Sequence, residues 1–262
     1  LGERRGELRI EGMTRALCRA GFAVEERRVR EVYHGSWRQY ERIWQTGREV
    51  DPHEQLTMLL AQLDPALPTR LDAAARAEVD EAYVAPIFSH PPPLNEGLVD
   101  VLRALRDRGS RLGLICNTGR TPGFAMRRLF SDYGVLGYFH ATAFSNEEGI
   151  RKPNPEIFQR VLRQLGTPAA EAVHVGDNVV ADIAGAKRSG MRAVLVRASY
   201  PSDLPVAPDA HIRNLGELLP AQSEIVLSGK VFIPFYMSLP LPRNRHLAAL
   251  RDEMQELVMN IV

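Results

Sequence analysis

Hydrophobic positions follow two different spacings along the chain, and the change between them divides it into parts. From Leu8 to about Ala85 the apolar residues recur at helical spacing, and no strand-like run interrupts them. This pattern predicts a helical module at residues 1–88. Its helices are expected around Leu8–Leu17 and over Glu25–Thr46, Leu56–Leu63 and Asp72–Tyr83.

Short apolar runs then alternate with amphipathic stretches up to residue 220. Pro86 and the run Pro91–Pro93 are expected to exclude regular structure and to form a hinge before this region. The alternation predicts an α/β fold, a Rossmann-like parallel sheet with helices on both faces, over residues 89–220. Strands are expected at Arg111–Cys116, Tyr138–Phe144, Ala172–Val175 and Ala193–Val196, and helices at Glu96–Arg108, Gly123–Tyr133, Glu156–Leu165 and Val179–Ser189.

The tail, residues 221–262, does not continue this pattern. It contains two strand-like runs, Ile225–Leu227 and Val231–Met237, followed by Pro240 and Pro242 and by an amphipathic helix candidate at Leu247–Val262. Farther back, Trp37, Tyr40 and Trp44 share one broad face of the expected helix Glu25–Thr46. Such a stripe belongs either to the core or to the wall of a substrate pocket.

Composition narrows the possible partners. The 262 residues include 33 basic and 32 acidic side chains, for a net charge of +1, so no global field favours nucleic acid or an anionic membrane. No run reaches the ~18 uninterrupted apolar residues of a membrane span, and no signal-peptide pattern opens the chain. With only Cys18 and Cys116 as cysteines, a reducing, cytoplasmic location is expected. A monomer and a homodimer both stay open.

The strand–helix–strand stretch Ala172–Val196 carries two carboxylates. Asp177 follows the expected strand, and Asp182 lies five residues later in the following helix. Ligands bind at the carboxyl ends of strands in such sheets, and two carboxylates there suit Mg²⁺. Alternatively, both residues cap the helix and complement its dipole.

Other polar residues follow the neighbouring strands. Asn117 and Thr118 come after Cys116, and Lys152 lies in the loop Asn146–Asn154. A lone lysine is usually a solvated surface residue. Because the ends of parallel strands converge, however, an ammonium, hydrogen-bond donors and a metal-binding carboxylate pair together predict a phosphate site.

These segments resemble the motifs of the haloacid dehalogenase (HAD) superfamily over roughly residues 8–220. Gly176-Asp177-x4-Asp182 is similar to its fourth motif, Gly149–Phe158 to its third, and Leu112–Gly119 to its second. The family usually has Ser or Thr where this chain has Cys116, and a thiol is a poor donor to phosphate. The helical residues resemble the family's cap domain.

The resemblance implies a role for each site residue. Lys152 would be the catalytic lysine that steadies the nucleophile and the phosphate. Asp177 would be catalytic as a direct Mg²⁺ ligand, and Asp182 would hold the metal directly or through water. The phosphate site would comprise Cys116, Asn117, Thr118 and Lys152.

The family's first motif, Asp-x-Asp on the central strand, occurs nowhere in these residues. Three explanations stay open: the sequence starts late and the motif is lost upstream, the protein is a natural relative without the nucleophile, or the tail replaces the central strand. The run Lys230–Met237 is apolar enough for such a strand but carries no carboxylate.

The implied activity is Mg²⁺-dependent hydrolysis of a small phosphorylated metabolite through an aspartyl-phosphate, with the nucleophile absent from the residues at hand. One alternative is a non-catalytic scaffold that keeps the phosphate and Mg²⁺ pocket. The other is a metal-independent haloacid dehalogenase, which would leave the pair Asp177/Asp182 unexplained.

Overall fold

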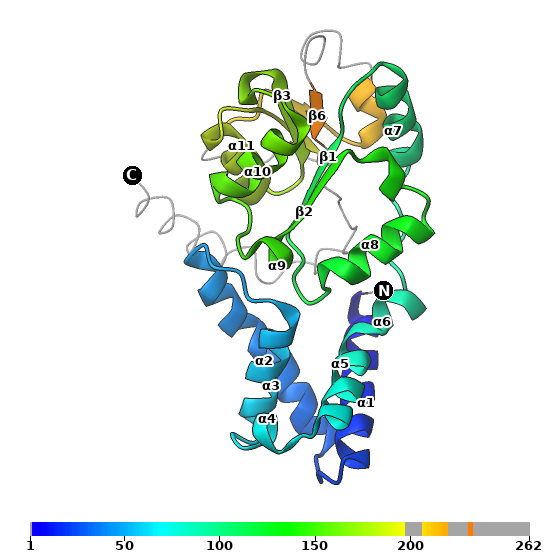
Figure 1. The fold of residues 1–262 in the computed structure, drawn as a ribbon, viewed down its shortest axis with the longest axis vertical. Helices are drawn as coiled ribbons and strands as arrows, with labels where there is room; N and C mark the ends of the chain where they lie inside the picture. The colour runs from blue at the N-terminus through cyan, green and yellow to red at the C-terminus, as the bar shows by residue number, and fades with distance from the viewer. Residues whose placement is uncertain (1, 197–205, 220–229, 233–262) are drawn as a thin grey trace.

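The computed structural model describes residues 2–196, 206–219 and 230–232 of the chain. A layer of helices lies at one end of the molecule, and a parallel sheet flanked by helices lies at the other (Figure 1). The first layer, called here the helical module, consists of α1 (Gly2–Arg19), α2 (Glu26–Gln45), α3 (Pro52–Leu63), α4 (Leu67–Arg70) and α5 (Ala73–Val84). The helices expected from the apolar spacing are therefore confirmed, and α4 lies where only a loop was expected.

The module has its own apolar core. Ile10, Met13 and Leu17 of α1 pack with residues of α2, α3 and α5, and all three are fully buried. Asp51 and Asp72 start α3 and α5, because their carboxylates accept hydrogen bonds from the first free backbone N–H groups. Spacing and capping thus explain why this stretch forms separate helices.

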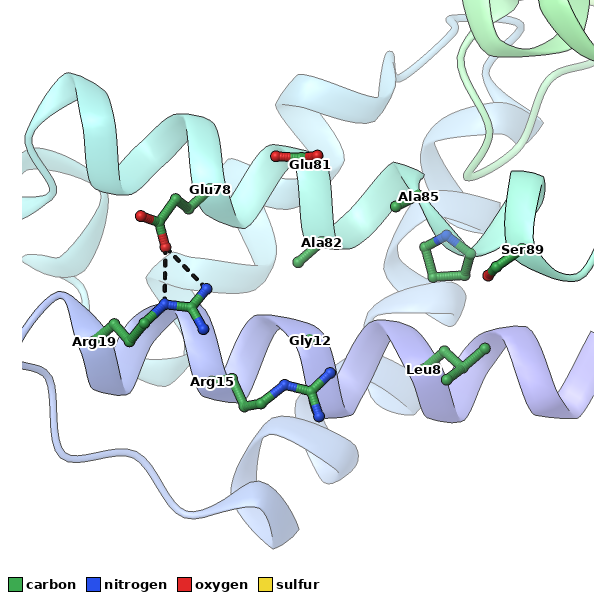
Figure 2. A pocket seen from close by; sticks show the side chains of 10 residues that line it. Leu8, Gly12, Arg15, Arg19, Glu78, Glu81, Ala82, Ala85 and Ser89 are labelled. Carbon is green, nitrogen blue, oxygen red and sulfur yellow. Dashed lines mark hydrogen bonds and ion pairs between the residues drawn. The ribbon is translucent and has the colours of Figure 1, made fainter.

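A shallow groove of about 400 Å³ runs between α1 and α5 (Figure 2). The helices approach closely there, because Gly12 has no side chain and faces Ala82. The rim is charged, with Arg19 and Glu78 joined by an ion pair of 2.9 Å. None of the residues predicted for the phosphate and metal site lines this groove.

The segment between the two layers differs from its prediction. Pro86–Ser89 forms a short helix, α6, although Pro86 was expected to exclude regular structure. Proline is well tolerated in the first turn of a helix, where its missing N–H group has no acceptor to lose. Pro91–Pro93 lie outside helices and strands, as expected.

Six parallel strands form the sheet, in the order β2-β1-β6-β3-β4-β5. Five follow one another in the region where strands were expected. They are β1 (Gly113–Cys116), β2 (Ala141–Phe144), β3 (Ala172–Gly176), β4 (Arg192–Val196) and β5 (Ala210–Ile212).

The sixth strand, β6 (Lys230–Phe232), comes from the tail and lies between β1 and β3. Its backbone pairs with Ala172–His174 on one side and with Gly113 on the other. Residues 230–232 thus lie in the middle of the sheet, which is the position that the third explanation, a tail strand in place of the central strand, predicts for them. The other tail elements predicted from sequence, at Ile225–Leu227 and Leu247–Val262, lie outside the described residues.

Helices cover both faces of the sheet (Figure 1). Side chains alternate along each strand: Leu114 and Cys116 face α7 (Leu98–Asp107) and α8 (Gly123–Asp132), and Ile115 faces α10 (Pro155–Leu165) and α11 (Gly185–Arg188). This two-sided burial is typical of a parallel α/β sheet and confirms the predicted fold class. In the parts of the chain that the structure describes, no helix is long and apolar enough to cross a bilayer.

Because β6 completes the middle of the sheet, we expect it to be essential for stability. Val231 pairs with Val173, and proline at 231 would remove a backbone donor from a central strand. Val231→Pro should lower the free energy of unfolding by about 3 kcal/mol or more, measured by urea denaturation. Val231→Ile keeps the donor and an apolar, β-branched side chain and serves as the control. A Val231→Pro variant as stable as the unaltered chain would show that β6 is dispensable.

Candidate active site

The carboxyl ends of β1, β2 and β3 lie along one edge of the sheet. Cys116 pairs with Phe144 at the ends of β1 and β2, and Gly176 ends β3. Asn117 and Ser145 directly follow the first two strands, and Asp177 follows the third. The topology therefore places the predicted polar residues at one edge.

At this edge a buried ion pair joins two of the predicted residues. Lys152 Nζ lies 2.6 Å from Asp182 Oδ1, and only 6% of the lysine and 2% of the aspartate is exposed. His174, fully buried on β3, lies with Nε2 2.9 Å from the same oxygen. Because a carboxylate only accepts, His174 Nε2 donates to it. Three side chains from separate segments thus form one buried polar cluster.

The electrostatics of this cluster favour an ionised Asp182. Burial alone would raise the pKa of Asp182, but the charge of Lys152 and the hydrogen bond from His174 hold that pKa below its usual range. Burial lowers the pKa of His174, even though the contact with Asp182 opposes the shift. At neutral pH the cluster therefore contains one ammonium, one carboxylate and one neutral imidazole.

The backbone after β3 brings Asp182 to its partners. Asn178 starts a short π-helical segment, η3 (Val179–Ala184), and its side chain accepts from Val180 N and Ala181 N. Asn178 N donates to Asp182 Oδ2 at 3.0 Å. A Cβ at Gly176 would collide with the Asp182 side chain, so the glycine of the motif makes room for the carboxylate. The side-chain cap of η3 comes from Asn178.

Asn117 and Thr118 hold the loop that follows β1. The Asn117 amide donates to Lys152 O at 3.0 Å and accepts from Lys152 N at 2.9 Å, so it clamps the backbone of the lysine. Thr118 N donates to Ser145 Oγ at 2.9 Å, and the two hydroxyl oxygens lie 3.2 Å apart. The second and third predicted motifs are thereby joined.

Cys116 lies at the same edge, but its thiol is buried and protonated. Burial is the main cause that raises the pKa of Cys116 to about 11, while the charge of Lys152 acts in the opposite direction. Since the thiolate is the nucleophilic form, Cys116 is inert at neutral pH.

The carboxylates offer a limited donor set for a metal. Asp177 is half-buried, while both oxygens of Asp182 already accept hydrogen bonds. Within the residues that the structure describes, no group of three or more His, Cys, Asp or Glu side chains could hold a metal ion. Mg²⁺ is commonly bound by one or two carboxylates together with waters and substrate phosphate, so this hard oxygen pair fits it.

Sequence reasoning missed three contributors to the site. His174 left a signal, since it alone interrupts the apolar run of β3. Ser145 gave no signal in the sequence, because serine is a common residue in the loops that follow strands. Arg120, which is buried beside the β1 loop, falls in no periodic pattern.

Breaking the buried ion pair should be costly. Lys152→Met leaves the Asp182 charge without its cation, which should reduce the free energy of unfolding by about 3–5 kcal/mol in denaturant titrations. The double variant Lys152→Met/Asp182→Asn should regain part of that loss, because no charge is stranded. Lys187→Met, which breaks the half-exposed pair with Asp209, is the control and should cost about 1 kcal/mol or less. Additive losses in the double variant would contradict this account.

The two cysteines should differ in reactivity with an aromatic disulfide reagent at pH 8. Cys18 is exposed and should react at once, whereas buried Cys116 should react only after unfolding. Cys18→Ser should therefore leave no fast phase in the absorbance trace. Two thiols that react at similar rates in the folded protein would show that the edge is open to solvent.

Comparisons with known proteins place this chain. A family model described as haloacid dehalogenase-like hydrolase matches residues 10–190. Glyceraldehyde 3-phosphate phosphatase of Methanopyrus kandleri is 30% identical over 221 residues, covering 80% of this chain and 87% of the relative. Phosphoserine phosphatase of Thermus thermophilus is 35% identical over 123 residues, covering 47% of this chain and 48% of the relative.

Solved structures agree with this placement. A 2-haloacid dehalogenase from Pseudomonas syringae superposes with a TM-score of 0.60 at 26% identity, covering 82% of this chain and 91% of that one. A HAD phosphatase from Thermococcus onnurineus superposes with a TM-score of 0.56 at 22% identity, over 86% and 89% of the two chains. By its sequence, its sheet and its edge of polar side chains, this chain belongs to the haloacid dehalogenase-like hydrolase family.

Proposed function

We propose that the edge formed by the ends of β1, β2 and β3 binds Mg²⁺ and the phosphate group of a small phosphate ester. The observation that carries this proposal is the contact of Lys152 with Asp182, at the edge where Asp177 follows β3. An ammonium beside carboxylates, in a region sheltered from water, suits a metal–phosphate complex better than an uncharged ligand.

The charges of the cluster argue for a metal. Asp182 neutralises the ammonium of Lys152, and His174 is neutral. These three side chains therefore carry no net charge and do not by themselves attract a phosphate group. A divalent cation would supply the missing positive charge, so we expect phosphate to bind only when Mg²⁺ is present.

Each predicted residue has a role in this proposal. Asp177 would be the direct metal ligand, and Asp182, whose oxygens already accept three hydrogen bonds, would hold the metal directly or through water. The Thr118 hydroxyl donates to phosphate, while Asn117 fixes Lys152 through the backbone of the lysine. The Cys116 thiol is a weak hydrogen-bond donor and contributes little to phosphate binding. When bound, Mg²⁺ neutralises phosphate oxygens and polarises the P–O bond.

The helical module is assigned the role of the family's cap. It contacts the loops after β1 and β2, as expected of a layer that covers the site. Glu49, at the end of the α2–α3 connection, pairs with Arg151 at 3.2 Å beside Lys152. Gln55 of α3 donates to Gly119 O at 2.8 Å beside Thr118.

Hydrolysis is the activity that the named relatives support. They are phosphatases of glyceraldehyde 3-phosphate and phosphoserine, which favours a small phosphorylated metabolite as substrate. The aspartate nucleophile implied by the HAD resemblance has no counterpart in the 262 residues, since they contain no Asp-x-Asp sequence. We therefore expect these residues alone to bind phosphate without forming an aspartyl-phosphate, and this is the behaviour of a binding scaffold.

A haloacid dehalogenase is the second candidate, because one superposed structure carries that name. Such an enzyme would release halide from a 2-haloacid in the presence of a chelator. Chloride release from 2-chloropropionate in EDTA therefore separates the two candidates.

The metal proposal is tested by calorimetric titration with MgCl₂, and then with inorganic phosphate in the presence and absence of Mg²⁺. Asp177→Asn should weaken Mg²⁺ binding at least about tenfold, because a neutral amide replaces a charged ligand. Asp100→Asn, on the exposed face of α7, should leave it unchanged. An assay with 4-nitrophenyl phosphate runs beside the titrations.

Each outcome decides something. Phosphate binding that requires Mg²⁺, without turnover, supports the proposal as stated. Turnover by residues 1–262 would show that they supply a nucleophile after all. Mg²⁺ affinity equal in Asp177→Asn and in the unaltered chain would remove Asp177 from the site, and phosphate binding in EDTA would refute the charge argument.

A further inference from the structure

Arg120, two residues after Thr118, belongs to the loop after β1, but its side chain is buried in the helical module. Its Nη1 donates to Tyr83 Oη at 2.9 Å, and its Nη2 donates to Tyr33 O at 2.8 Å and to Ser36 Oγ at 3.0 Å. The side chain is only 9% exposed. One guanidinium therefore ties this loop to both α2 and α5.

The surroundings of Arg120 are unusual because its charge is compensated without a carboxylate from the part of the chain that the structure describes. Among the described residues, no Asp or Glu forms an ion pair with Arg120. Aromatic rings surround the cation instead: its Cζ lies 4.1 Å from the ring centroid of Tyr33, 5.1 Å from that of Tyr40 and 5.3 Å from that of Trp37. Burying a charge is costly unless it is compensated, and π faces with fixed acceptors provide that compensation.

The module also holds both neighbours of Arg120. Gln55 Nε2 donates to Gly119 O at 2.8 Å, and Arg9 Nη2 donates to Thr121 Oγ1 at 3.2 Å. Thr121 N in turn donates to Thr118 O at 3.1 Å. Three consecutive residues of the loop are thus fixed by the module, and the third is hydrogen-bonded to Thr118.

We propose that Arg120 is a positioning residue that locks the β1 loop against the helical module and thereby sets the position of the Thr118 hydroxyl, the donor to phosphate. This inference rests on the proposed function, because it assigns Thr118 to phosphate. Arg120 itself points into the module, so it acts through the loop backbone and not by touching the ligand.

The hydrogen-bond acceptors around Arg120 require an arginine. The acceptors come from two helices, and only a planar fork with several donors reaches Tyr83, Tyr33 and Ser36 together. Lysine keeps the charge but offers one compact ammonium. The conservative replacement therefore separates positioning from simple electrostatic attraction.

The test uses the full chain with Arg120→Met and Arg120→Lys. With saturating MgCl₂, calorimetric titration with inorganic phosphate should show roughly tenfold weaker binding in both variants, as expected when the hydrogen bonds to the anion are misplaced. Mg²⁺ affinity should change less than about twofold, since Asp177 follows a different strand. Tyr83→Phe removes one acceptor and provides a milder variant if Arg120→Met does not fold.

A matched control comes from the same interface. Arg5 of α1 is also buried, and its Nη1 donates to His90 O at 3.0 Å, in the connection after α6 and not in the β1 loop. Arg5→Met should lower the melting temperature and leave phosphate affinity unchanged. If the folded Arg120 variants are less stable but bind phosphate with unaltered affinity, Arg120 is structural only. If Arg120→Lys binds phosphate as tightly as the unaltered chain, charge alone matters.

A second readout needs no ligand. In a Cys18→Ser background, the reaction of Cys116 with an aromatic disulfide reports on the start of the β1 loop. We expect at least roughly tenfold faster labelling in Arg120→Met than in Arg5→Met, because local opening controls the labelling of buried groups. Equal labelling rates in Arg120→Met and Arg5→Met would overturn the positioning role of Arg120, whether or not the chain binds phosphate. Failure of the unaltered chain to bind phosphate would count against the proposed function alone.

Discussion

A buried salt bridge, Lys152 with Asp182, is the contact on which the arrangement of the site depends. Two charges removed from water must stay together, because separating them strands a charge in the interior. The lysine comes from the segment before α10 and the carboxylate from η3, so the pair fixes two loops relative to β3. His174 and the backbone of Asn178 donate further hydrogen bonds to the carboxylate, and the missing side chain of Gly176 provides its space.

Much of this arrangement could be predicted from the sequence, because topology carries the information. Once short apolar runs alternate with helices, the sheet is parallel and the carboxyl ends of its strands share an edge. Asn117, Lys152 and Asp177 could therefore be grouped without any knowledge of their contacts. The capping alternative was also reasonable, but Asn178 provides that cap.

What the sequence could not provide is long-range pairing and exact hydrogen bonding. The sequence presented the run Lys230–Met237 as one of three explanations for the missing central strand, and only the structure places residues 230–232 between β1 and β3. The identity of the Thr118 partner, Ser145, depends on where two loops meet. Pro86 was misjudged because proline disrupts the interior of a helix and not its first turn.

The helical module is part of the framework of the site and not an added layer. Buried contacts connect it to the loops that carry the predicted phosphate-binding residues. Among them, Arg120 reaches from the β1 loop into α2 and α5, and Arg151, beside Lys152, pairs with Glu49. Glu49 also accepts from Trp44 on α2, whose ring lies under Arg151. The aromatic stripe of α2 is accordingly divided, since Tyr33 and Tyr40 are core residues, whereas Trp37 is 39% exposed beside Gly119. A helix that looks like a simple core element thus supports both loops, and its sequence must satisfy the packing of the module and the charges of the sheet edge together.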